Sequence, residues 1–114
     1  MVRIKRVYDP PARGDGYRVL IDRLWPRGIR KEALRHDAWL RDLAPSTELR
    51  KRFHGEPELF GEFEALYLKE LRSPQVRPLL EELAKLARRR TVTLLFAARD
   101  TEHNNAVVLA RELN

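Results

Sequence analysis

The sequence predicts an α/β fold, a single compact layered domain over residues 1–114 with a small, mostly parallel sheet flanked by helices. Three observations predict it. Short strand-like segments alternate with longer helical ones. Residues 91–98 are β-branched and then continuously apolar, which is typical of a central strand with helices on both faces. The length of 114 residues suits one domain, and no repeat or linker divides the chain.

The amino-terminal part predicts two strands joined by a loop. Residues 2–8 alternate apolar and basic side chains, as in a strand with one solvent-facing side. Residues 9–16 contain prolines and glycines, which indicate a loop. Residues 17–22 include three consecutive apolar side chains, so this second strand should be covered on both faces. Pro26 and Gly28 then indicate a turn.

The middle of the chain predicts short elements. Residues 31–34 predict a short helix, and residues 39–43 predict a buried segment with a short third strand. Ser46 is expected to be the N-cap of a helix that includes residues 49–53.

The second half predicts three helices and the central strand. Residues 58–71 carry one apolar stripe. Ser73 and Pro74 are expected to begin the next helix, which ends at the basic run 88–90. After the strand 91–98 and a polar loop, residues 106–113 return to helical spacing.

The composition excludes several chemistries. The chain has no cysteine, which removes disulfides, thiolate zinc sites, iron–sulfur clusters and a cysteine nucleophile. The three histidines show no metal-ligand spacing, and no glycine-rich phosphate loop or nucleophile elbow occurs. The two serines both lie at predicted helix starts, so a Ser–His hydrolase is poorly supported. The sequence implies no metal and no cofactor.

The charge balance points to anionic partners. The net charge is +6, which attracts nucleic acid or phosphorylated metabolites. The alternative is a compositional bias that serves solubility, because the basic residues are mostly arginine. No segment reaches the roughly 18 apolar residues of a membrane span, and the first residues lack the apolar run of a signal peptide. We therefore expect a cytoplasmic protein without a membrane partner.

Polar segments follow the two strands 17–22 and 91–98. In open parallel sheets, ligands bind beyond the carboxyl ends of the strands. If these strands are neighbours, their loops converge on one site. Its candidate residues are Asp22, Arg23, Arg27, Arg99, Asp100, Glu102, His103, Asn104 and Asn105.

These residue types suggest a site for an anion. The loop that opens the last helix offers free N–H groups, which favour an anion. Arg23, Arg27 and Arg99 would add guanidinium donors, and Asp100, Asn104 and Asn105 would complete the ligand-binding set. As the tentative catalytic pair, Asp22 would position an arginine and His103 would act as acid or base.

Each of these residues also has a structural interpretation. Asp100 or Thr101 is equally suited to capping the last helix. Asp22 and Arg23 could form an internal ion pair that fixes the turn. His103 without a placed partner is by default an exposed loop histidine.

Three long segments resemble the YeaO-like family of uncharacterised prokaryotic proteins, a branch of domain of unknown function 488. They are GYRVLIDRLWPRG at 16–28, WLRDLAPS at 39–46 and VTLLFAARDTEHNNAVVL at 92–109. The resemblance covers nearly the whole chain and implies a compact α/β domain. It brings no established activity.

The wider group to which this family belongs adds one comparison. Its other members carry an Asp-Val-Arg pattern followed by a proline, which Asp22 and Pro26 match. They also carry a Cys-His-Arg triplet where this chain has Asn104, Asn105 and Ala106. A thiolate nucleophile cannot operate here, whereas amides still bind and orient a ligand.

Three functional hypotheses remain open at this point. The first is a protein that binds or acts on a small anionic or phosphorylated ligand at the converged loops. The second is a basic nucleic-acid-binding or accessory module without catalysis, which requires the arginines to form one surface stripe. The third is a structural protein whose polar loops only hold the fold. Substrate, reaction and oligomeric state do not follow from the sequence.

Overall fold

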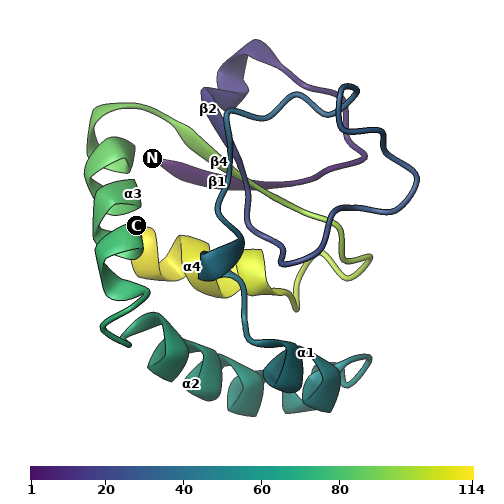
Figure 1. Cartoon of the computed structure of the whole chain (residues 1–114), viewed down its shortest axis with the longest axis vertical. Helices are drawn as coiled ribbons and strands as arrows, with labels where there is room; N and C mark the ends of the chain where they lie inside the picture. The colour runs from purple at the N-terminus through teal and green to yellow at the C-terminus, as the bar shows by residue number, and fades with distance from the viewer.

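Four parallel strands form one sheet in the order β1-β4-β2-β3, and the predicted α/β class is confirmed. The computed structural model describes all residues, 1–114 (Figure 1). The strands are β1 (Val2–Arg6), β2 (Tyr17–Leu20), β3 (Ala38–Trp39) and β4 (Val92–Phe96). The helices are α1 (Thr47–Phe53), α2 (Phe60–Leu71), α3 (Arg77–Arg89) and α4 (Asn105–Leu113). The helices do not combine the length and apolar character that a membrane span needs.

The strand β4 lies at the centre, as its apolar sequence predicts. It pairs with β1 on one side and β2 on the other, so Val92 is opposite both Val2 and Tyr17. All five residues of β4 are buried. Because β1, β2 and β4 are parallel, their carboxyl ends lie at one edge of the sheet, which we call the carboxyl edge, and their amino ends at the other, the amino edge.

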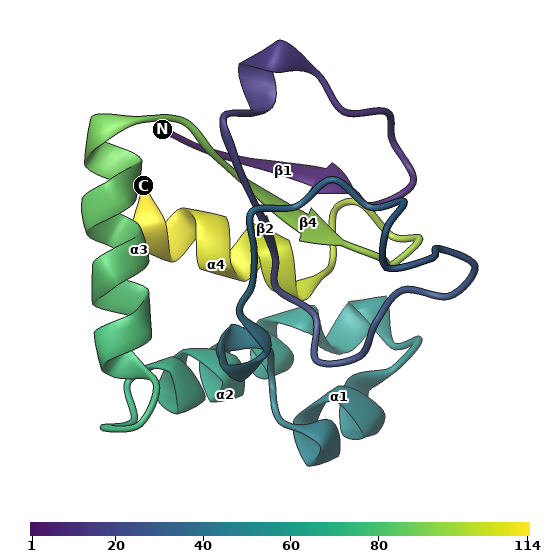
Figure 2. The ribbon, with the colours of Figure 1, turned by 45° about the horizontal axis from the view of Figure 1, so that its top comes forward.

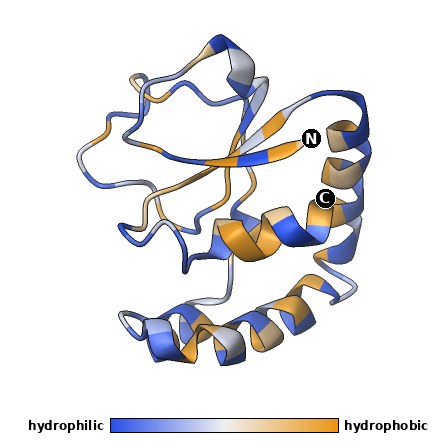
Figure 3. Cartoon of the chain, turned by 180° about the vertical axis from the view of Figure 1, so that it is seen from behind, coloured by the Kyte–Doolittle hydropathy of each residue, from blue (hydrophilic) through white to orange (hydrophobic).

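All four helices cover the same face of the sheet. The main core joins alternate residues of the strands, such as Val19 and Leu94, to side chains of every helix. Helix α4 packs directly on β1 and β4, and α2 and α3 pack against α4 (Figure 2). In Figure 3 the helices alternate orange and blue stripes, as expected for amphipathic helices with one buried side.

Loops, rather than helices, cover the other face. Here the structure differs from the expectation of helices on both faces. A second core cluster contains Val7, Leu20, Leu34 and Leu95, and no helix contributes to it. Side chains of the 21–39 segment pack against this cluster, with Trp25 among them. Large aromatic side chains from an irregular segment therefore bury this face without a second helical layer.

Two local predictions are wrong and two are confirmed. Residues 31–34 form a turn, because a helix this short lacks enough backbone hydrogen bonds to persist alone. Helix α3 begins at Arg77 rather than at Ser73, with Pro78 in its first turn. The short third strand exists as β3. Ser46 is the N-cap of α1, as predicted, and its hydroxyl accepts a hydrogen bond from the Leu49 N–H at 3.2 Å.

Candidate functional site

The two predicted loops meet at the carboxyl edge, and Asp22 joins them. Its Oδ2 accepts a hydrogen bond from the Ala97 N–H at 2.9 Å, just after β4. Its Oδ1 accepts one from the Asn105 side-chain amide at 3.1 Å, at the start of α4. The same amide also donates to the Ile21 carbonyl at 3.2 Å. One carboxylate thus links the ends of two strands to the first turn of a helix.

Neutral donors alone hold the Asp22 carboxylate. Burial raises the pKa of Asp22, and the hydrogen bonds from Asn105 and Ala97, together with the charge of Arg50, only partly offset that effect. The ion pair with Arg23 that sequence reasoning allowed is absent. Arg23 instead donates from Nε and Nη2 to the carbonyls of residues 45 and 44, both at 3.3 Å.

Asp100 and His103 form a pair on the loop before α4. The Asp100 carboxylate accepts hydrogen bonds from the backbone N–H groups of Glu102, at 2.9 Å, and His103, at 3.0 Å. It also contacts His103 Nδ1 at 2.9 Å. The backbone hydrogen bonds are the main reason that the pKa of Asp100 is lowered. His103 stands edge-on to Phe60 with ring centroids 5.3 Å apart, and its Nε2 has no partner in the chain.

Asn104, rather than Asp100 or Thr101, is the N-cap of α4. Its Oδ1 accepts from the Val107 N–H at 3.0 Å, and its Nδ2 donates to the Asp100 carbonyl at 2.9 Å. The side chain is buried, with both polar atoms engaged. Asn104 therefore holds the loop in place.

Arg27 and Arg99 remain exposed and form no ion pair. Arg6, the last residue of β1, and Tyr8, in the turn after it, hold their loops in place. Tyr8 donates its hydroxyl to the Arg27 carbonyl at 2.9 Å. Arg6 donates from Nε and Nη2 to the carbonyls of residues 98 and 97 at 2.9 and 3.0 Å. The Arg6 guanidinium also lies 4.8 Å from the centre of the Tyr8 ring, which connects the two anchors.

Sequence reasoning missed Arg6, Tyr8 and two residues of the helices. The rule that ligands bind beyond strand ends also applies to the first strand and would have found Arg6 and Tyr8. The charge of Arg50, on α1, lowers the pKa of Asp22, and the charge of Asp22 raises the pKa of Tyr67, on α2. Neither residue lies in a sequence motif. Tyr67 is fully buried and donates its hydroxyl to the Leu43 carbonyl, and burial, with the charges of Asp22 and Glu70, raises its pKa.

The candidate residues thus fall into three groups. Asp22 and Asn105 are joined at the strand ends, and Asp100, His103 and Asn104 are joined within one loop. The arginines are separate, since Arg23 faces the 44–45 carbonyls while Arg27 and Arg99 have no side-chain partner. No cluster of three metal-ligating side chains forms. A hollow of about 410 Å³ beside α1 and α2 contains none of the candidate residues.

The fold and this edge define a small α/β protein with a parallel sheet and a polar carboxyl edge that lacks a thiol. The chain belongs to the DUF488 family, because residues 1–114 match the model described as the inactive DUF488-N3 subclade. The resemblance to YeaO-like proteins is confirmed.

Relatives in Escherichia coli and in mycobacteria cover almost the whole chain. Uncharacterized protein YeaO of Escherichia coli K12 is 48% identical over 109 residues, which is 96% of this chain and 93% of that protein. Uncharacterized protein Mb3100c of Mycobacterium bovis and uncharacterized protein Rv3073c of Mycobacterium tuberculosis are each 46% identical over 113 residues, 99% of this chain and 93% of each relative. No solved structure matches the chain significantly.

Proposed function

We propose that this protein binds a small phosphorylated anion at the carboxyl edge of its sheet and does not transform it. The observation that carries the proposal is the pair of unpaired guanidinium groups, Arg27 and Arg99, on two loops that are both anchored at the carboxyl end of β1. Tyr8 and Arg6 anchor those loops by hydrogen bonds of 2.9 to 3.0 Å. Guanidinium groups match phosphate oxygens in bidentate geometry.

His103 adds a further polar atom to this edge. Its Nδ1 is engaged by Asp100, so the ring is oriented and Nε2 is available to a ligand. In its protonated form His103 donates from Nε2 to an anion. Of the two tentative catalytic residues, His103 thereby becomes a binding residue in this proposal.

The helix start itself is a poorer place for the anion than the sequence suggests. The Asn104 oxygen already accepts from Val107 N–H, and the Asp22 carboxylate contacts the Asn105 side chain at the same end of α4. A second anion there would meet the charge of Asp22. We therefore place the ligand outward from Asp22, between Arg27 and Arg99, and assign Asp22 the role of positioning Asn105.

Three observations favour binding without catalysis. Asp22 is partly buried, and its carboxylate already accepts hydrogen bonds from the Ala97 N–H and the Asn105 side chain, so it is committed to contacts within the protein. The family model that matches the chain is described as inactive. Because the chain has no cysteine, the edge also lacks the strongest protein nucleophile at neutral pH.

Thermal unfolding in the presence of phosphorylated compounds tests this function. We would titrate inorganic phosphate, pyrophosphate and nucleoside mono- and triphosphates at low salt. A compound present at 100 times its Kd stabilises the folded state by about 2.7 kcal/mol, which raises the Tm measurably. Arg27→Gln combined with Arg99→Gln should remove the rise.

The matched control is Lys31→Gln combined with Lys51→Gln, which removes the same charge from other exposed positions. The control should keep the rise in Tm. The proposal fails if no compound in the panel shifts the Tm, or if both double variants weaken binding equally. Equal weakening would mean that the net charge of +6, rather than the edge, attracts the anion.

A further inference from the structure

Five exposed arginines gather at the amino edge of the sheet, opposite to the proposed anion site. They come from three segments that are distant in the sequence: the start of β1, the short turn of helix at 13–15, and the end of α3 with the residue that follows it. None of them takes part in an ion pair with a side chain. These amino-edge arginines are Arg3, Arg13, Arg88, Arg89 and Arg90.

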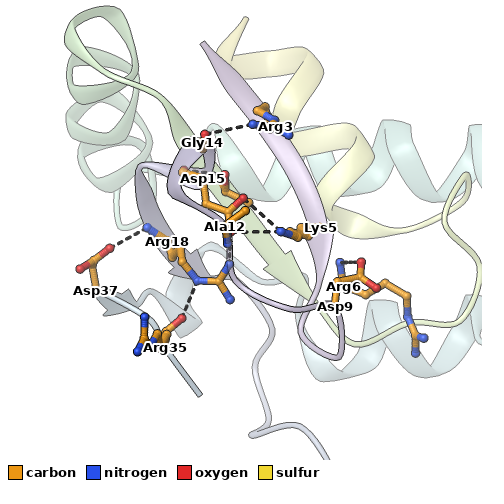
Figure 4. Close-up of polar contacts among 11 residues, drawn as sticks. Arg3, Lys5, Arg6, Asp9, Ala12, Gly14, Asp15, Arg18, Arg35 and Asp37 are labelled. Atoms are coloured by element: carbon orange, nitrogen blue, oxygen red, sulfur yellow. Dashed lines mark hydrogen bonds and ion pairs between the residues drawn. The ribbon is translucent and has the colours of Figure 1, made fainter. Parts of the chain in front are cut away.

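Contacts hold the three segments at the same edge of the sheet. Arg3 donates from Nη1 to the Gly14 carbonyl at 3.0 Å, beside Arg13 (Figure 4). The Arg90 guanidinium lies 5.5 Å from the centre of the Tyr17 ring, at the start of β2. Figures 1 and 2 both show the end of α3 and the turn at 13–15 at the top of the molecule.

No acidic side chain in these segments compensates the charge. The only one, Asp15, is 1% exposed, and Lys5 and Arg18 pair with it inside the protein. Favourable placement at a helix C-terminus explains Arg88 and Arg89 in part. It does not explain Arg3 and Arg13, which lie outside any long helix.

We propose that the amino-edge arginines bind the phosphate backbone of a nucleic acid. A phosphate backbone requires an array of cations and no apolar anchor. A protein partner, by contrast, is usually held by exposed aromatic or large apolar residues that become buried. The large apolar side chains that are exposed on this protein are Met1, Tyr8, Leu24 and Leu59, and only Met1 lies at this edge. The surface therefore suits sequence-independent contact with phosphates.

The number of arginines fixes the salt dependence that we expect. Five phosphate contacts give a slope of log K against log salt of about −4.5 for duplex DNA and about −3.5 for a single strand. Between 50 and 200 mM salt the affinity for a duplex should then fall several hundred-fold.

Fluorescence anisotropy with a labelled duplex and a labelled single strand of about 20 nucleotides, at several salt concentrations, tests the proposal. Arg89→Gln combined with Arg90→Gln should weaken binding at 50 mM salt and reduce the magnitude of the duplex slope by about 1.8. Lys31→Gln combined with Lys51→Gln removes the same two charges elsewhere and should leave the slope unchanged. Arg27→Gln combined with Arg99→Gln should also bind nucleic acid normally, which separates this surface from the proposed function.

Three results would overturn the proposal. The first is the absence of binding to either probe at 50 mM salt. The second is an equal loss of affinity in the amino-edge variant and the lysine control, which would assign the binding to net charge alone. The third is equally tight binding of polyglutamate or of anionic lipid vesicles with the same salt slope, which would show a general polyanion surface. Circular dichroism on each variant verifies that the fold is retained.

Discussion

Two aspartates beside the same sheet, Asp15 and Asp22, have pKa values that are shifted in opposite directions. Burial disfavours the charged form of Asp15, but hydrogen bonds from a backbone N–H, Lys5 and Arg18 outweigh it, so its pKa is lowered. Asp22 accepts from an N–H and from the Asn105 amide, and burial dominates, so its pKa is raised. Cations therefore stabilise one carboxylate as an ion, while the other is ionised only at a cost.

The surroundings of Asp15 explain why that cluster is structural. Figure 4 shows how it pins two loops onto the face of the sheet that lacks helices. Arg18 donates from Nε to the Arg35 carbonyl at 2.7 Å and from its backbone N–H to the Asp37 carboxylate at 2.8 Å. Thr93 donates to the Asp15 carbonyl at 2.6 Å. The Asp22 cluster connects loop ends instead, where a ligand can change the contacts.

Asp15→Asn should give the largest effect. The variant leaves Arg18 and Lys5 without their anion, and Arg18 is 6% exposed. Breaking a buried pair on one side costs about 3 to 5 kcal/mol. Urea unfolding at neutral pH measures the loss. Asp42→Asn, at an exposed position without an ion pair, should change the free energy of unfolding by less than about 0.5 kcal/mol. Equal effects at both positions would mean that Asp15 is not the anchor of this face.

The sequence was sufficient to predict the elements with strong periodicity. The buried strand β4 and the apolar stripe of α2 follow directly from residue order, because one long pattern specifies each. The loop-covered face was not predictable. Its cover depends on Trp25, whose Nε1 donates to the Ile29 carbonyl at 2.6 Å, and on Arg18, which reaches Asp15. Such contacts join irregular segments that have no periodic pattern.

The candidate site was predictable only as a neighbourhood. The rule for strand ends predicts that Asp22 and Asn105 lie near each other, and their amide–carboxylate contact is 3.1 Å. It could not tell which residues are already engaged. Asn104 and Asn105 are adjacent and chemically identical, yet one is a buried cap and the other contacts Asp22. Side-chain direction at the start of a helix decides this, and residue type does not reveal it.

Two glycines offer a second comparison between the two clusters. Gly16, next to Asp15, has φ +62°, and a Cβ there would clash with the Thr91 carbonyl oxygen. Gly28, in the loop with Arg27, has φ +77° and open space around it. Gly28→Ala should cost only the left-handed backbone penalty of about 1 to 2 kcal/mol. Gly16→Ala should cost at least about 1 kcal/mol more, because backbone must move.

Thermal and urea unfolding of the two alanine variants measures this difference directly. Neither variant removes a side chain, so the comparison isolates the backbone. If Gly28→Ala is the more damaging, the carboxyl-edge loop is the more tightly constrained region, and the contrast drawn between the clusters is reversed.

Asn104→Ala should have a smaller effect. It removes the N-cap of α4, and the loss of a cap typically costs about 1 kcal/mol. Thr101→Ala is the control, because Thr101 is exposed and does not cap the helix. It should change the free energy of unfolding by less than about 0.5 kcal/mol. A larger loss of stability from Thr101→Ala than from Asn104→Ala would indicate that Thr101 caps the helix, as the sequence allows.

Asp22→Asn should have the smallest effect at neutral pH, within about 1 kcal/mol, because it removes a buried charge but also one hydrogen-bond acceptor. The variant should differ from the natural protein mainly in how the free energy of unfolding depends on pH. The raised pKa means that the native state holds a proton that the unfolded chain has lost above about pH 4. The Asp22 contribution to the free energy of unfolding therefore falls as the pH rises from about 4 through the native pKa, and this fall should be missing in the variant.

The contribution of Asp15 to the free energy of unfolding changes with pH in the opposite direction. Its lowered pKa gives a stabilising contribution that is present above the ordinary aspartate pKa of about 3.9 and is lost as the pH falls through the native value. Urea unfolding from pH 3 to pH 7 separates the two. Asp22→Asn should steepen the rise in stability with pH, and Asp15→Asn should flatten it. Parallel shifts in both variants would show that the two carboxylates titrate alike and that their different surroundings have no energetic consequence.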